Sequence, residues 1–101
     1  SPIQVKILPI TDNQIEYAKK IESELKKHKV RVELDESNEK IGYKIRKAQL
    51  EKVPYMLVLG AKEQEGNLVA VRSRKDGDLG QMKIDEFVQK IQREIENKVI
   101  E

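Results

Sequence analysis

The chain has 101 residues, enough for one compact domain, and its 20 basic and 18 acidic side chains give a net charge of +2, which does not by itself indicate nucleic acid. The sequence contains no cysteine and one histidine, which excludes disulfides, thiolate metal sites and His-rich zinc centres. No apolar run approaches the ~20 residues of a membrane span, and the first residues lack a signal-peptide pattern, so we expect a cytoplasmic protein without a membrane partner.

A strand and a helix are predicted first. Residues 3–8, IQVKIL, alternate apolar and polar side chains, which is typical of a strand, and Pro9 marks its end. Thr11 and Gln14 have the spacing of a capping box at the start of a helix. The apolar stripe that follows predicts that this helix runs to about His28.

A second strand and a second helix follow. VRVEL at residues 30–34 has strand periodicity again. Residues 39–52 predict an amphipathic helix whose apolar face carries Ile41, Ile45 and Ala48. The opposite face, which we expect to be exposed to solvent, carries Lys40, Lys44 and Lys47.

The second half of the chain predicts a buried strand, a hairpin and a final helix. Residues 53–60, VPYMLVLG, form a continuous apolar run, typical of a central strand covered on both faces. Gly66 and Asn67 indicate a turn before residues 68–74, LVAVRSR, so a hairpin is expected. After a loop, a third helix is predicted with one apolar stripe formed by Ile84, Phe87, Val88, Ile91 and Ile95.

This order of elements predicts an α/β fold. The two strand-helix-strand crossovers make the first three strands parallel by the right-handed crossover rule. The hairpin adds an antiparallel strand, so the sheet is mixed and flanked by helices. No repeat or linker divides the sequence, and we expect one domain over residues 1–101.

The second predicted helix has features that packing alone does not require. Gly42 costs about 1 kcal/mol relative to alanine inside a helix, which suggests close approach by a neighbouring element or a ligand. Residues 38–52 hold five basic against two acidic side chains, a surplus larger than that of the whole chain. Tyr43 adds an aromatic face, and a second basic cluster comprises Arg72, Arg74 and Lys75.

Single-stranded RNA suits this combination. Basic side chains attract phosphates, and an aromatic ring can stack on an unpaired base. The alternative is that the lysines form only a solvated helix face. A nucleotide-binding enzyme is disfavoured, because the turn after the first strand reads PITDNQ instead of a glycine-rich phosphate loop.

Four blocks of the sequence resemble a known family. In this order, SNEKIGYKIRKAQLEKVPYMLVLGAKE, VAVRSR, GDLGQM and DEFVQKIQREI are similar to the C-terminal anticodon-binding domains of threonyl-tRNA synthetases, which are class II aminoacyl-tRNA synthetases. The resemblance implies a three-layer α/β/α anticodon-binding-domain fold. Its five-stranded mixed sheet is flanked by three helices and includes a short fifth strand at residues 79–82. It also implies a domain excised from a longer synthetase, in keeping with a first residue other than methionine.

The resemblance implies six RNA-binding residues. The family's anticodon-reading positions fall on Asn38, Glu63 and Arg72, and Lys40, Lys44 and Arg46 are expected beside them as contacts to the RNA backbone. Threonine anticodons share a middle guanine, and arginine can donate to its O6 and N7 while glutamate can accept from its N–H groups. Ala61 departs from the family, which commonly has an acidic residue there, and this departure leaves the setting of Glu63 open.

Each of these residues also has a purely structural interpretation. Asn38 could cap the second helix, and Glu63 could be a loop carboxylate paired to a lysine. Arg72 could be a solvated residue of a strand face. Tyr43 and Tyr55 could pack in the protein with a wet hydroxyl.

The resemblance therefore implies an RNA-recognition module without catalytic activity. It is expected to read the anticodon loop of threonine tRNA for an ATP-dependent threonine-tRNA ligase, whose ATP and zinc sites lie in a separate catalytic domain. The parent is expected to be a homodimer and the fragment a monomer without cofactors. A protein-interaction module of the same fold that does not bind RNA, or a redesigned domain without function, remains the alternative.

Overall fold

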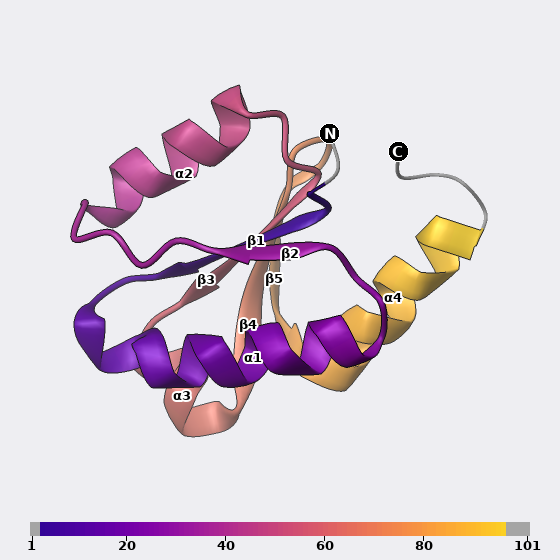
Figure 1. Cartoon of the computed structure of the whole chain (residues 1–101), viewed down its shortest axis with the longest axis horizontal. Coiled ribbons are helices and arrows are strands. Elements are labelled where there is room, and N and C mark those ends of the chain that lie inside the picture. Colours follow the sequence, from indigo (N-terminus) through magenta and orange to yellow (C-terminus); the bar gives the residue numbers. More distant parts are fainter. Residues whose placement is uncertain (1–2, 97–101) are drawn as a thin grey trace.

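A mixed five-stranded sheet forms the middle layer of the protein. The computed structural model describes residues 3–96 (Figure 1). The strand order is β2-β1-β3-β4-β5. β1 pairs in parallel with β2 and β3, whereas β4 runs antiparallel to both β3 and β5, as predicted for the mixed sheet. The strands are β1 Val5–Pro9, β2 Val32–Leu34, β3 Tyr55–Leu59, β4 Leu68–Ser73 and β5 Gly77–Lys83.

The fifth strand is longer than the predicted residues 79–82. β5 contains Gly80 with a φ of 84° and pairs with β4 through a register shift beside Val71 and Arg72. A positive φ and a bulge break the alternation of side chains that identifies a strand in a sequence. The residue pattern therefore did not reveal this strand, and the resemblance implied only its residues 79–82.

Three longer helices lie where the sequence predicts them: α1 Ile15–Lys27, which follows a 3-10 turn at Asp12–Gln14, α2 Ile41–Leu50 and α4 Ile84–Glu96. A further short helix, α3 Ala61–Gly66, joins β3 to β4 and was not predicted. Six residues span fewer than two helical turns, too few for an apolar periodicity to appear. The expected turn at Gly66 and Asn67 is where α3 ends, and Asn67 is left-handed, with a φ of 55°.

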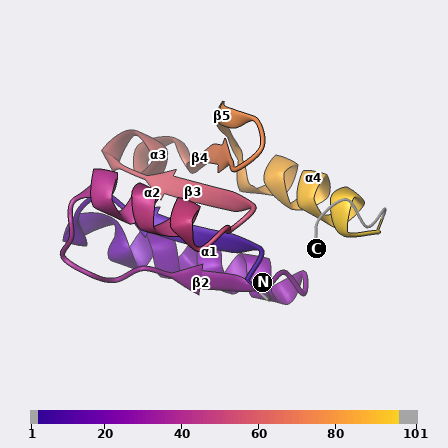
Figure 2. The same ribbon diagram turned by 90° about the horizontal axis from the view of Figure 1, so that it is seen from above.

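The helices cover the two faces of the sheet unequally, as Figures 1 and 2 show. On one face, α1 and α4 enclose the main core, which includes Ile7, Leu25, Leu57 and Phe87. On the other face, α2 packs on β1 and β3 through a smaller cluster around Leu8, Ala48 and Met56. The predicted three-layer arrangement is confirmed. Within residues 3–96, the apolar cluster under α2 includes no residue of β4 or β5, so we call the α2 side of these two strands the open face; α3 borders it, because Glu63 reaches Gln81 there.

A buried lysine joins the sheet to the end of α2. Lys6 on β1 is 3% exposed, and its Nζ lies 2.6 Å from Glu51 Oε1 and 3.3 Å from Glu33 Oε1. Burial of the ammonium group lowers the pKa of Lys6, but the hydrogen bonds and charges of the two glutamates outweigh burial and leave that pKa raised. The ion pairs therefore hold the charged form of the lysine in place.

The ends of α1 and α2 share an unusual feature. Both helices close with a Schellman motif, in which Val30 N–H bonds to Leu25 O at 3.1 Å and Val53 N–H bonds to Ala48 O at 3.2 Å. The left-handed position of each motif is lysine instead of glycine: Lys29 has a φ of 62° and Lys52 a φ of 61°. Left-handed backbone at a residue with a Cβ costs free energy, so these two turns are strained.

Candidate nucleic-acid interface

The carboxyl ends of the parallel strands form one rim of the sheet. In open α/β sheets, ligands bind outside this edge, where the connections from neighbouring strands diverge to opposite faces. A cavity of about 310 Å³ lies here, between the turn after β1, the loop after β2 and the start of α2. Its lining includes Ile10, Asp12, Asn38 and Lys44.

Asn38 is exposed at this cavity and available to a ligand. Its side chain makes no hydrogen bond with any residue of the described range 3–96. The N-cap of α2 is Lys40, so the interpretation of Asn38 as the helix cap is wrong. The preceding turn is ordered by Asp35, whose Oδ1 accepts a hydrogen bond of 2.9 Å from Ser37 N–H. Burial raises the pKa of Asp35. Hydrogen bonds from Ser37 and the charges of nearby lysines lower it by a larger amount, so the net shift of this pKa is downward.

Lys44 is not on the solvent-exposed face of α2, contrary to the prediction. The residue is 3% exposed, and its Nζ donates a hydrogen bond of 3.0 Å to Pro9 O at the end of β1. A long lysine side chain can lie along an apolar helix face and still reach a polar partner at its edge, which the residue spacing alone did not reveal. Lys40 and Lys47 are exposed as predicted, and Arg46 is exposed as well.

Glu63 is buried in the fold instead of lying in a loop. It occupies the third position of α3, and its Oε1 accepts a hydrogen bond of 2.7 Å from the N–H of Gly60, the residue that precedes the helix. Its Oε2 accepts a hydrogen bond from Gln81 Nε2 on β5. The alternative interpretation, a loop carboxylate paired to a lysine, is therefore wrong, since both carboxylate oxygens accept from uncharged groups.

Arg72 lies on the open face and carries an unsatisfied donor. It pairs with Met56 of β3 and with Asp78 of β5 along the backbone, which places its side chain on the α2 side of the sheet. Its Nε is buried and has no hydrogen-bond partner among residues 3–96, and the guanidinium forms no ion pair within that range. A buried donor without a partner costs about 1–3 kcal/mol, although the rest of this half-buried side chain is in contact with solvent.

The structure places Asn38 and Glu63 near the rim, but it places Arg72 away from it. Ile10 connects the surroundings of Asn38 and Glu63: it lines the cavity beside Asn38 and packs against Gly60, whose N–H bonds to Glu63, and a Cβ added at Gly60 would lie 2.8 Å from Ile10 Cδ1. Arg72 lies opposite Met56 near the start of β3, toward the other end of the sheet, and two residues along β4 from Ala70. Gln81 lies opposite Ala70 and joins Glu63 to this face.

Gln81 was missed by the sequence reasoning. Its side chain is exposed on an edge strand, and its contact with Glu63 spans 18 positions in the chain. Nothing in the local pattern of GDLGQM distinguishes it from a solvated glutamine. Only the pairing of β4 with β5 brings it to the site.

Two other observations concern the region around α2. Gly42 is exposed in the first turn of the helix, and a Cβ added there would meet nothing within 4 Å. No neighbouring element therefore explains this glycine. Tyr43, next to it, is 55% exposed, so the interpretation that it packs inside the protein is wrong. Its ring is available for contact with a partner.

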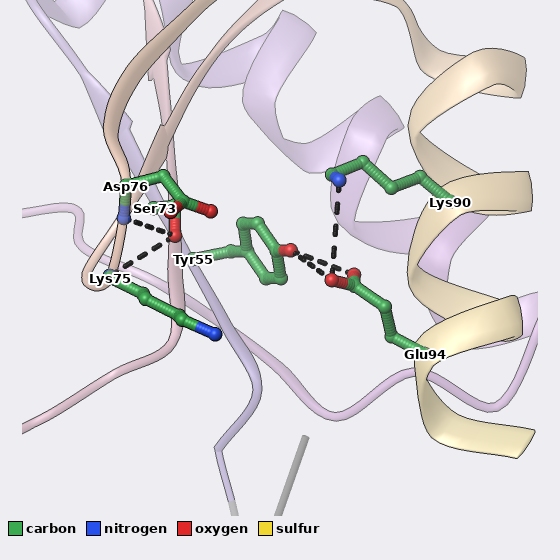
Figure 3. A network of polar contacts seen from close by, with 6 residues as sticks. All are labelled: Tyr55, Ser73, Lys75, Asp76, Lys90 and Glu94. Atoms are coloured by element: carbon green, nitrogen blue, oxygen red, sulfur yellow. Dashed lines mark hydrogen bonds and ion pairs between the residues drawn. The ribbon is translucent and has the colours of Figure 1, made fainter. Parts of the chain in front are cut away.

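A second polar cluster lies at the other end of the sheet and holds α4 in place (Figure 3). Tyr55 is buried, with its ring edge-on to Phe87 at a centroid distance of 5.6 Å, and its hydroxyl donates to the Glu94 carboxylate at 2.7 Å. Burial and the Glu94 hydrogen bond raise the pKa of Tyr55. Nearby, Ser73 Oγ accepts from the backbone N–H groups of Lys75 and Asp76, each at 3.1 Å. These contacts are internal, so we interpret the cluster as structural.

Two further classes of site find no support in the described part of the chain. Among residues 3–96, no group of three or more His, Asp or Glu side chains is arranged to hold a metal ion. No helix described there has the length and apolar character needed to cross a membrane.

Known proteins resemble the chain in sequence and in fold. Residues 4–94 match the family described as the anticodon binding domain. A threonine-tRNA ligase of Clostridium botulinum is 62% identical over 98 residues, which are 97% of this chain and 15% of that protein. A threonine-tRNA ligase of Clostridium tetani is 57% identical over 101 residues, 100% of this chain and 16% of that protein. The chain thus spans about a sixth of the length of these relatives.

Solved structures agree with the sequence comparison. The RNA-binding domain of threonyl-tRNA synthetase from Cryptosporidium parvum Iowa II superimposes with a TM-score of 0.87 at 34% identity, covering 92% of this chain and 24% of that chain. A prolyl-tRNA synthetase from Cryptosporidium parvum gives a TM-score of 0.84 at 29% identity over 95% of this chain and 21% of that chain. The resemblance read from the sequence is confirmed, and the chain belongs to the anticodon-binding-domain family.

Proposed function

We propose that this domain binds the anticodon loop of threonine tRNA and reads its middle guanine through the open face. The observation that carries the proposal is the Arg72 guanidinium, a cation without a protein partner whose Nε is buried on that face. The Glu63 carboxylate is joined to the same face through Gln81. A cationic donor beside acceptor groups complements guanine, which offers O6 and N7 as acceptors and its N–H groups as donors.

The surroundings suit an RNA loop. Exposed basic residues at the start and along the side of α2, Lys40, Arg46 and Lys47, can contact phosphates. The ammonium group of Lys44 donates a hydrogen bond to Pro9 O and lines the cavity beside Asn38. In this proposal only its remaining N–H donors can contact RNA. Unstacked bases of a loop can be read on their edges and stacked on an aromatic ring such as Tyr43.

The domain would work as one part of a longer enzyme. We propose that the parent is an ATP-dependent threonine-tRNA ligase, as the names of the two clostridial relatives suggest. Activation of threonine with ATP and any zinc site would then belong to the catalytic part of the parent, and this single domain would supply recognition without cofactors. A cytoplasmic location, a homodimeric parent and a monomeric isolated domain complete the proposal.

The direct test is binding of a labelled threonine anticodon stem-loop, measured by fluorescence anisotropy at several stated salt concentrations. Changing the middle guanine to adenine should weaken binding by roughly 1–3 kcal/mol, or about 5- to 150-fold. Equal affinity for both loops, or no binding of either, would contradict the proposal and favour a protein-interaction module.

Substitution of Arg72 tests the assignment of that residue. Arg72→Ala should abolish most of the preference for guanine, because the donor pair to O6 and N7 is lost. Arg72→Lys keeps the charge but lacks the planar pair of donors, so it should retain part of the affinity and lose the selectivity. If Arg72→Ala retains the wild-type ratio of the two affinities, Arg72 does not read the base.

A further inference from the structure

We infer that Gln81 is a further specificity-determining residue, which contacts the base directly and is held in its reading orientation by Glu63. The inference rests on the proposed function and refines it. In this arrangement Glu63 acts through Gln81, while the exposed amide of Gln81 presents the acceptor to guanine.

Both carboxylate oxygens of Glu63 are occupied within the protein. The residue is 8% exposed, and each carboxylate oxygen already accepts a hydrogen bond, Oε1 from Gly60 N–H and Oε2 from Gln81 Nε2. The bond to Gly60 fixes the carboxylate at the first turn of α3. Glu63 is therefore rigidly placed, little exposed, and engaged on both oxygens by the protein itself.

The Glu63 carboxylate fixes the orientation of the Gln81 amide. An ionised carboxylate can only accept hydrogen bonds, so the group that faces it must be the amide nitrogen. The carbonyl oxygen Oε1 of Gln81 must then point away from Glu63. Glu63 thereby determines which end of the amide is offered to a ligand, which a free glutamine on a strand surface would not do.

Arg72 is a neighbour of Gln81 on the open face. Gln81 is directly opposite Ala70, and Arg72 follows Ala70 by two residues on the same face of β4. Ala70 is small, so little side chain rises between the glutamine and the arginine. The open face consequently offers an acceptor from Gln81 and donors from Arg72 on neighbouring strands, outside the apolar cluster that α2 covers.

Guanine matches this pair. Arg72 can donate to O6 and N7, while Gln81 Oε1 can accept from N1–H or the 2-amino group. Adenine lacks the N1–H donor and has an amino group where guanine has O6, so it would oppose donor to donor at Arg72. A preference for guanine follows from both residues together.

The experiment compares Gln81→Met, Glu63→Gln and the double variant in the 101-residue chain. Methionine keeps the length of the side chain and removes its polar atoms. We expect Gln81→Met to reduce the ratio of guanine to adenine affinity by about tenfold. Because Glu63 acts through Gln81, the double variant should lose no more of this ratio than Gln81→Met alone, a non-additive result.

A matched control is Gln89→Met, which changes an exposed glutamine on α4, the helix on the other face of the sheet. It should leave both affinities unchanged. Thermal unfolding followed by circular dichroism checks that each variant has the wild-type melting temperature, so that a change in the affinity ratio reports recognition and not folding.

Several outcomes would overturn the inference. A wild-type affinity ratio in Gln81→Met would show that the amide does not touch the base. Tighter guanine binding by that variant would show that Gln81 competes with the base for Glu63 Oε2. If the wild-type chain itself does not distinguish the two loops, the proposed function fails and the role of Gln81 fails with it, whereas selectivity retained in Gln81→Met alone refutes only the role of Gln81.

Discussion

At the scale of single residues, the two left-handed lysines are the clearest local strain in the protein. Lys29 closes α1 with a φ of 62°, a conformation that glycine adopts without a steric penalty. Lys29→Gly should therefore raise the free energy of unfolding by about 0.5–1 kcal/mol, measured by urea denaturation with circular dichroism. Lys20→Gly, at an exposed position in the interior of α1, should instead lower it by about 1 kcal/mol. A Lys29→Gly variant no more stable than the wild type would show that the lysine side chain compensates for its strained backbone.

At the scale of elements, α4 is fixed to the sheet by packing of Phe87 and by the hydrogen bond from Tyr55 to Glu94. Tyr55→Phe keeps the ring and removes the hydroxyl donor, leaving a carboxylate whose side chain is 23% exposed. Because water can partly replace the lost donor, we expect a decrease of about 1 kcal/mol in the free energy of unfolding, seen as a lower melting temperature. Tyr43→Phe removes a hydroxyl from the exposed face of α2 and should leave the melting temperature unchanged. Equal effects of the two substitutions would refute a role for the Tyr55 hydroxyl in docking α4.

At the scale of the whole molecule, Lys6 joins β1, β2 and α2 through its two glutamate partners. Its pKa is raised above the ordinary value of 10.5, so folding favours the protonated form. The sign of the effect follows from linkage: the stabilisation is fully present below pH 10.5 and is lost as the pH rises through the higher folded pKa. Thermal melts above pH 10.5 should therefore show a loss of stability that is smaller in Lys6→Met. The comparison isolates Lys6 from the other lysines, and parallel pH profiles of the two proteins would contradict this role.

The long elements were predictable because their signals are local. Apolar periodicity revealed α1, α2 and α4, and the continuous run of residues 53–60 identified the central strand β3. The parallel direction of β1, β2 and β3 was predicted from the two strand-helix-strand crossovers, whereas the central place of β1 between the other two was not. The short helix α3 and the full length of β5 escaped, because six residues carry no periodicity and a bulge interrupts alternation.

The sequence by itself determined the class of fold and the family, because hydrophobic pattern and characteristic residue blocks are properties of neighbouring positions, and it supplied Asn38, Glu63 and Arg72 as candidate base readers. Only the tertiary structure decided how those readers are presented. Lys44 is buried and donates to Pro9 O. Glu63 caps the start of α3, and Gln81 donates a hydrogen bond to Glu63 from the edge strand β5. The reason is physical: a side chain's exposure and hydrogen-bond partners depend on which distant segments pack against it, and those contacts exist only after the sheet has assembled.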